Sequence, residues 1–277
     1  MKGRQVENIQ IHKIRTGAIN EAADKVAVEE PLQIQLVYST ATGQMLKDIA
    51  VTMRTPGNDE ELAAGFLFTE GIVKRAEDIS KIKHAHADEN GVQVILKENV
   101  IPMLGSAARN FYTTSSCGIC GKASIDAIQT VSQYEAVKNN SIIPSAIFYT
   151  LQNELKNQQK LFKDTGGIHA SALFDVEGKF IMLREDVGRH NALDKIIGAA
   201  MMSNQLPLNY CILLLSGRAS FELLQKAVMA GIKIIASVCA PSSLAVEMAN
   251  ENDVTLIGFL KEDRFNIYSG KERISLK

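Results

Sequence analysis

The sequence predicts an α/β fold in which an α+β N-terminal part precedes a helix-flanked, largely parallel sheet. In residues 210–260, short apolar runs alternate with helical segments, which indicates right-handed crossovers between parallel strands. The N-terminal half instead shows alternating apolar and polar residues around turn signals, which is typical of hairpins. The 277 residues are 46% hydrophobic and 22% charged, the balance of a globular protein with a sizeable core.

Two hairpins are expected in the N-terminal half. Residues 31–53 alternate around a turn near positions 41–43, and residues 81–97 alternate around Asn90-Gly91, a strong hairpin turn. The first 17 residues are polar and lack the apolar core of a signal peptide, so no secretory signal is expected there.

Three helices are expected before residue 161. One follows the Pro-Gly turn of "RTPGNDEELAAGFLFTEGI", with Asn58 or Asp59 as N-cap and Gly71 at its end. Another is indicated by helical spacing over residues 122–134. The polar stretch 152–160 suggests a solvent-facing helix near a domain boundary. We therefore expect two domains, residues 1–145 and 146–277.

The C-terminal half is more regular. Its expected elements are a hairpin over 169–186, an amphipathic helix over 189–202, strands over 210–216, 233–240 and 254–260, and helices over 220–231 and 242–252.

Ligands of open α/β sheets bind where the strands end, so the segments after these strands are candidate binding groups. Basic side chains and small residues gather there, which suits a phosphorylated or nucleotide-like ligand, although no G-x-G-x-x-G or Walker motif is present. Gly217 could be only a turn glycine, and Arg189 and His190 could be only solvated. The candidates are Ser216, Gly217, Arg218, Ser242, Lys261, Arg264, Arg184, Arg189 and His190.

Two of the four cysteines, Cys117 and Cys120, form a C-x-x-C pair in "TTSSCGICGKAS". A structural zinc site needs four ligands, and Cys211 and Cys239 lie in apolar strand segments where buried, inert core residues are expected. A thioredoxin-type switch would follow a strand, whereas the preceding stretch is polar and loop-like. A position before a helix and near cations favours a reactive thiolate, but an incidental disulfide or a partial metal site stays open.

Bulk properties narrow the function classes. The formal net charge of −1 argues against a general nucleic-acid or membrane-surface binder. No apolar run approaches the roughly 20 residues needed to span a bilayer. A cytoplasmic location is expected, where disulfides are rare and a close cysteine pair is more often catalytic or metal-binding.

Taken together, six blocks resemble the formate dehydrogenase accessory sulfurtransferases, the FdhD family. From about residue 30 to the C-terminus they occur in the family's order: "RTPGNDEELAAGFLFTEGI", "SSCGICGKASID", "TGGIHASAL", "REDVGRHNALDKIIG", "SGRASFELLQKA" and "TLIGFLKEDRFNIY".

The resemblance implies a cytoplasmic sulfur carrier. Cys117 would take sulfur from a cysteine desulfurase as a persulfide, and Cys120 would assist or resolve. The sulfur would pass to a molybdenum bis(molybdopterin guanine dinucleotide) client destined for formate dehydrogenase. The family's cofactor-binding segment maps onto Phe259, Leu260, Lys261, Glu262, Asp263 and Arg264. Arginine is expected at position 261, and lysine there loses the bidentate fork.

The resemblance also implies a C-terminal fold similar to cytidine deaminases, and a homodimer. Zinc deaminases need H-x-E and P-C-x-x-C, but Ser171 stands where the glutamate would be after His169, so neither deamination nor a catalytic zinc is expected. The alternatives are a non-enzymatic cofactor-binding chaperone whose cysteines bind zinc or are spectators, and a thiol-disulfide oxidoreductase.

Overall fold

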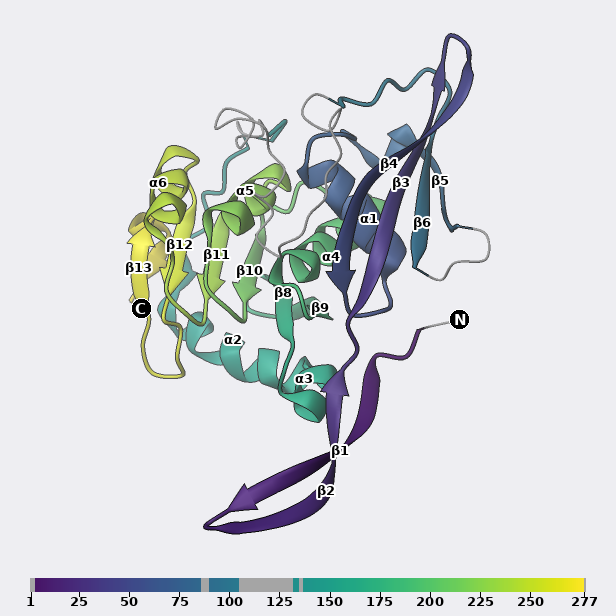
Figure 1. The fold of residues 1–277 in the computed structure, drawn as a ribbon. Coiled ribbons are helices and arrows are strands. Elements are labelled where there is room, and N and C mark those ends of the chain that lie inside the picture. Colours follow the sequence, from purple (N-terminus) through teal and green to yellow (C-terminus); the bar gives the residue numbers. More distant parts are fainter. Residues whose placement is uncertain (1–2, 86–89, 105–131, 135–136, 277) are drawn as a thin grey trace.

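The six-stranded sheet of the C-terminal half is the centre of the fold. The computed structural model describes residues 3–85, 90–104, 132–134 and 137–276 (Figure 1). The sheet has the order β13-β12-β11-β10-β8-β9. Its strands are β8 (His169–Asp175), β9 (Phe180–Asp186), β10 (Cys211–Leu215), β11 (Ile234–Ser237), β12 (Thr255–Gly258) and β13 (Asn266–Ser269).

This sheet is mixed, so the prediction of a largely parallel sheet is wrong. Within this sheet, only the pairs β10–β11 and β11–β12 are parallel. The β8–β9 hairpin joins the edge of β10 in the antiparallel sense, and β13 returns antiparallel to β12. The two added segments therefore reverse direction, although the alternation of strands and helices from β10 to β12 is as predicted.

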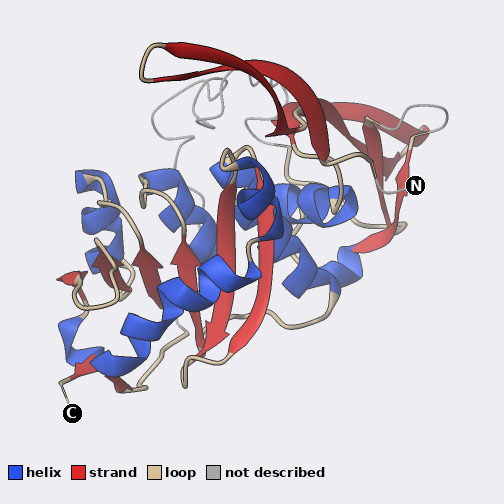
Figure 2. Cartoon of the chain, turned by 90° about the horizontal axis from the view of Figure 1, so that it is seen from below, coloured by secondary structure: helices blue, strands red, loops and turns tan. Residues whose placement is uncertain are grey.

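Helices cover both faces of the sheet, and the alternation of side chains along each strand builds two separate cores (Figures 1 and 2). On one face, Leu213, Ile235 and Leu256 pack toward α4 (Arg189–Met202), α5 (Phe221–Met229) and α6 (Ser243–Glu251). On the other, Ile212 and Ile234 pack with α2 (Ser145–Gln158).

The N-terminal half contributes a second sheet of order β4-β3-β6-β5, which confirms the first predicted hairpin and the antiparallel pairing of the second. The turn predicted at Asn90-Gly91 is not confirmed, because Gly91 is already the first residue of β6. Helix α1 (Asp59–Thr69) follows β4 as expected and buries most of its residues. Asn58 lies at the N-cap with φ 58° but makes no side-chain capping bond. The strands are β3 (Glu30–Thr40), β4 (Gly43–Arg54), β5 (Ile79–His84) and β6 (Gly91–Leu96), with a 3-10 turn, η1 (Ala76–Asp78), between α1 and β5.

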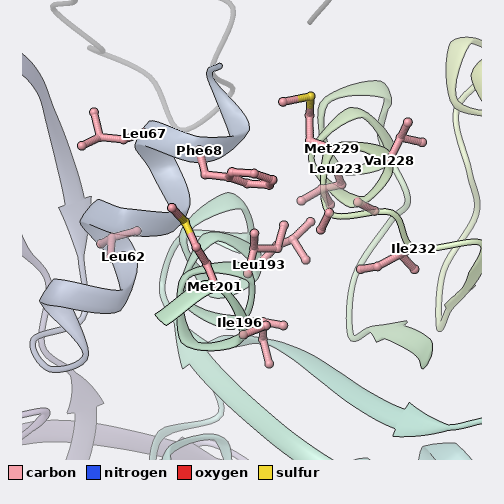
Figure 3. Close-up of a cluster of buried hydrophobic side chains, with 14 of the residues drawn as sticks. Leu62, Leu67, Phe68, Leu193, Ile196, Met201, Leu223, Val228, Met229 and Ile232 are labelled. Atoms are coloured by element: carbon pink, nitrogen blue, oxygen red, sulfur yellow. The ribbon is translucent and has the colours of Figure 1, made fainter. Parts of the chain in front are cut away.

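Helices α1 and α4 cross at two glycines. A Cβ on Gly65 would overlap the main-chain oxygen of Asp194, and one on Gly198 would overlap that of Glu61. Twelve of the 14 residues of α4 are buried, so its prediction as an amphipathic helix is wrong. The reason is α1, which covers the face that would otherwise meet water, so that α1, α4 and α5 share one core (Figure 3).

Two further segments differ from expectation. The N-terminal residues form a long antiparallel ribbon, β1 (Val6–Arg15) with β2 (Ala18–Ala27), which extends away from the body (Figure 1). Helix α2 covers the polar stretch 152–160 only in part and buries Leu151 and Leu155, so it is not solely solvent-facing. The remaining elements are α3 (Lys160–Thr165), η4 (Lys271–Arg273) and the short pair β7 (Ile143–Pro144) with β14 (Ile274–Ser275).

Residues 122–131 of the helix predicted over 122–134 lie outside the described residues, and so do Cys117 and Cys120. Within the described ranges, no helix is both long and apolar enough to cross a bilayer.

Candidate functional site

The segments after several strands lie together at one end of the six-stranded sheet, along the carboxyl ends of its parallel strands, and we call this end the rim. It comprises His169 at the start of β8 and residues 187–190, 216–219, 238–242 and 259–265, which follow β9, β10, β11 and β12. The register fixes this: Ser171 pairs with Leu215 and His169 with Asp186, because β8 runs against both neighbours. The segments predicted from separate parts of the sequence therefore lie along a common edge.

The turn after β10 is held in place by hydrogen bonds from neighbouring strands. The Ser216 hydroxyl accepts a bond from the Ala170 amide at 2.8 Å, and the Ser237 hydroxyl donates to the Gly217 carbonyl at 2.7 Å. Arg218 is exposed directly beyond them. Ser242 is exposed too, but its hydroxyl caps α6 by accepting from the Ala245 amide at 3.3 Å.

The segment after β12 is a loop anchored at both ends. Leu260 is fully buried, and its amide donates to the Ser237 carbonyl at 3.1 Å. Phe265 packs on Phe148 with ring centroids 5.4 Å apart. Between these anchors, the Lys261 amide donates to the Arg264 carbonyl at 2.8 Å and closes a turn. The side chain of Leu260 therefore positions the loop from the core, while residues 261–264 are exposed.

Phe259 is the unusual residue of this loop. Its φ of 54° lies in the left-handed region, which is unfavourable for a bulky side chain, and its side chain is 45% exposed. Its amide donates to the Cys239 carbonyl at 3.1 Å, which helps to hold the conformation. A strained, exposed aromatic residue held by its surroundings is the kind of feature that clusters at ligand sites.

The charges of the loop are unequally matched. Glu262 pairs with Lys156 of α2 at 3.1 Å, and Asp263 pairs with Arg264 at 3.3 Å. Lys261 has no ion pair with any residue that the structure describes. Among the described residues, the charge of Lys261 is therefore uncompensated, whereas Arg264 forms a largely exposed ion pair with Asp263.

The start of α4 carries the other predicted cations. Arg189 is half-buried, and its Nε atom is buried without a hydrogen-bond partner in the described part of the chain. His190 is 7% exposed. The idea that both are simply solvated is therefore wrong. Arg184 does not add to the rim, because it forms a two-bond ion pair with Glu61 of α1, whose hydrogen bonds raise the pKa of the guanidinium.

A buried ion pair lies next to the N-terminus of α4 and holds it in place. Asp186 is fully buried and lies 2.7 Å from Nζ of Lys195, and it also accepts a bond from the Gly188 amide at 2.8 Å. Thr55 of the "RTPG" block completes the arrangement, since its amide donates to Asp186 and its carbonyl accepts from Lys195. The N-terminal block "RTPG" therefore fixes the loop that presents Arg189.

His169 is a rim residue that the sequence did not single out as a ligand group. Burial lowers its pKa, the neighbouring Arg189 lowers it further, and Asp186 opposes both. Recognising it from sequence would have required knowing that β8 runs antiparallel to β10, because only then does the first residue of β8 lie at the carboxyl end of β10.

The four cysteines divide into two groups. Cys117 and Cys120 lie outside the described residues. Cys211 is half-buried, and burial together with Asp175 raises its pKa to about 11, in line with an inert thiol. Cys239 is exposed, so its prediction as a buried core residue is wrong: β11 ends at Ser237, two residues before it.

The rim as a whole is suited to an anionic ligand. Arg189, Arg218, Lys261 and Arg264 border it, two of its acids are already paired, and Phe259 offers an exposed aromatic face. In the described ranges, no group of three or more His, Cys, Asp or Glu side chains could hold a metal ion.

Known proteins resemble this chain over nearly its whole length. The family model "FdhD/NarQ family" matches residues 27–275. The chain is 48% identical to the sulfur carrier protein FdhD of Mycolicibacterium paratuberculosis, covering 91% of this chain and 92% of that protein. It is 40% identical to the sulfur carrier protein FdhD of Sulfurisphaera tokodaii, covering 98% and 99%.

A solved structure has the same fold. The crystal structure of a protein assigned as a formate dehydrogenase accessory protein in Desulfotalea psychrophila superposes with a TM-score of 0.76 at 26% identity, covering 98% of this chain and all of that one. A match of the family model to residues 27–275, with relatives at 40–48% identity over nearly their full length, establishes the relationship: this chain belongs to the FdhD/NarQ family.

Proposed function

We propose that this protein is a sulfur carrier that serves the maturation of formate dehydrogenase. The observation that carries the proposal is the end-to-end similarity to proteins named sulfur carriers, at 40–48% identity. The cytoplasmic location, a cysteine desulfurase as donor and a homodimeric assembly belong to the same proposal.

Cys117 is the proposed carrier. Its thiolate takes the sulfane sulfur of a donor persulfide, which forms a Cys117 persulfide and releases the donor's thiolate. Cys120 then attacks the inner sulfur of Cys117. This step forms a Cys117–Cys120 disulfide and releases hydrosulfide to the client, and an external thiol reduces the disulfide for the next cycle. The two cysteines thereby supply the electrons that convert sulfane sulfur to sulfide.

The proposed client is the molybdenum bis(molybdopterin guanine dinucleotide) complex, treated as a substrate. Its nucleotide ends carry diphosphates and guanine bases. The cations of the rim suit the diphosphate, and the exposed ring of Phe259 suits stacking against a base. The similarity of the C-terminal half to cytidine deaminases stays a prediction, as does the division at residue 145.

Replacing Cys117 by alanine is expected to abolish formate dehydrogenase activity in cells that depend on this protein, because no thiolate remains to carry sulfur. Formate dehydrogenase should still accumulate with molybdenum bound. The assay is formate oxidation in extracts, set against immunoblots and metal analysis. Cys211→Ala provides the matched control, since the raised pKa keeps this half-buried thiol unreactive. Full activity in the Cys117 variant would rule out the carrier role.

The chaperone alternative predicts a different zinc content for the purified protein. If Cys117 and Cys120 were zinc ligands, purified protein would contain about one zinc per chain or per pair of chains, lost on replacing either cysteine. The carrier model expects substoichiometric zinc that is unrelated to activity.

A further inference from the structure

His169 lies at the rim beside the turn that follows β10. A Cβ placed on Gly217 would lie 3.4 Å from Nδ1 and 3.5 Å from Cε1 of His169, so the imidazole rests against the bare main chain after β10. The residue is half-buried. A side chain at position 217 would fill this space in ordinary contact with the ring, whereas glycine leaves it open.

The hydrogen-bonding capacity of the ring is not used by the fold. Neither ring nitrogen of His169 has a hydrogen bond or ion pair to any residue within the described ranges. The charge of Arg189 acts on this ring, and the Nε atom of that guanidinium is buried and likewise without a hydrogen-bond partner in the part of the chain described. Two donors that the fold leaves unsatisfied thus border the same stretch of the rim.

Burial is the main cause that lowers the pKa of His169, and the charged groups around the ring modify this effect. Arg189, at the start of α4, disfavours a second positive charge, and Arg218 lies exposed beyond the turn that the ring contacts. The nearby acid, Asp186 of β9, favours protonation, but its charge is already compensated by Lys195 at 2.7 Å. Burial acts in the same direction as Arg189 and lowers the pKa of His169.

We propose that His169 is a ligand-binding residue of the rim, which donates a hydrogen bond to a phosphate oxygen of a nucleoside diphosphate that Arg189 also holds. The inference rests on the proposed function, because a guanine dinucleotide client supplies that group. A phosphate oxygen between the two side chains adds the negative charge that the free site lacks. The imidazole therefore takes up a proton on binding, and the pair becomes a two-cation clamp.

The sign of the pH dependence follows from this. The free imidazole has a pKa below its usual range, and the bound one has a pKa raised by the phosphate. Between these two values the complex holds a proton that the free protein does not, so affinity rises as pH falls through that interval.

The experiment is titration calorimetry of the full chain with GDP, and separately with inorganic pyrophosphate, in buffers of different ionisation enthalpy. His169→Ala is expected to weaken GDP binding roughly ten- to hundredfold, the range for a hydrogen bond to a charged group. His169→Gln keeps a donor but cannot titrate, so it should lose several-fold in affinity and all of the protein's proton uptake. Proton uptake by GDP itself is measured with His169→Gln and subtracted.

His12→Gln is the matched control, because His12 lies exposed on the β1–β2 ribbon and should change nothing. Circular dichroism melts establish that each variant is folded.

Unchanged affinity and proton uptake in both His169 variants would overturn this inference and leave the sulfur-carrier proposal standing. Failure of wild-type protein to bind either GDP or pyrophosphate would overturn the inference together with the client assignment, but not persulfide formation on Cys117. Loss of GDP binding with retained pyrophosphate binding would place His169 at the base instead, and would also overturn it.

Discussion

Gly198→Ala is expected to lower the free energy of unfolding by about 3 kcal/mol and the melting temperature by roughly 10 °C. Alanine ordinarily favours a helix over glycine by about 0.5–1 kcal/mol, so the intrinsic effect has the opposite sign. The methyl group would, however, overlap the main-chain oxygen of Glu61 in α1. A main chain inside a packed helix cannot move aside as a flexible side chain could, so the two helices must separate.

Gly167→Ala is the matched control for that experiment. Its Cβ would meet only the Thr165 carbonyl oxygen, at 3.9 Å, an ordinary van der Waals contact. Denaturant unfolding of both variants, followed by circular dichroism, separates close packing from a general effect of replacing glycine. Equal stability of Gly198→Ala and Gly167→Ala would contradict the close crossing of α1 and α4.

Lys226→Met is expected to cost about 3–5 kcal/mol, because it strands a buried carboxylate. Lys226 of α5 lies 2.9 Å from Asp194 of α4 and 3.5 Å from Glu70, which follows α1. Thr69 accepts a bond from the ammonium and donates one to Asp194. This cluster links the three helices that carry the shared core, and its removal should loosen all three.

The pH dependence of the Lys226 variant identifies the cause. Burial raises the pKa of Asp194, and Lys226 opposes that effect. Without the ammonium, the folded-state pKa rises further above the unfolded value. The variant should therefore be most stable at acidic pH and lose stability as pH rises through the folded-state pKa. The double variant Lys226→Met/Asp194→Leu should cost less than the sum of the single ones, and simple additivity would show that the pair is not coupled.

The pattern of strands and helices could be predicted from the sequence because alternating and helical spacings are local properties. The direction in which the β8–β9 hairpin joins the sheet could not, because a hairpin can pair through either strand and in either sense. The burial of α4 was missed for a related reason: its covering helix, α1, comes from more than a hundred residues earlier in the chain. The β1–β2 ribbon was missed because both of its faces are largely exposed, which leaves little apolar alternation to detect.

The candidate site was predictable to a similar degree. Strand ends followed by Gly217, Arg189 and the loop 259–264 could be recognised because ligands collect at that edge of such sheets. Three other features depend on tertiary contacts and could not be predicted. These are the ion pair of Arg184 with Glu61, the burial of Leu260 in the core and the position of His169 at the rim.

The most direct measurement is the intact mass of the purified protein after incubation with a cysteine desulfurase and cysteine. A gain equal to one sulfur atom is expected, which disappears on reduction and is missing from Cys117→Ala but present in Cys211→Ala. An unchanged mass in the wild-type protein, or the same gain in the Cys117 variant, would contradict the account.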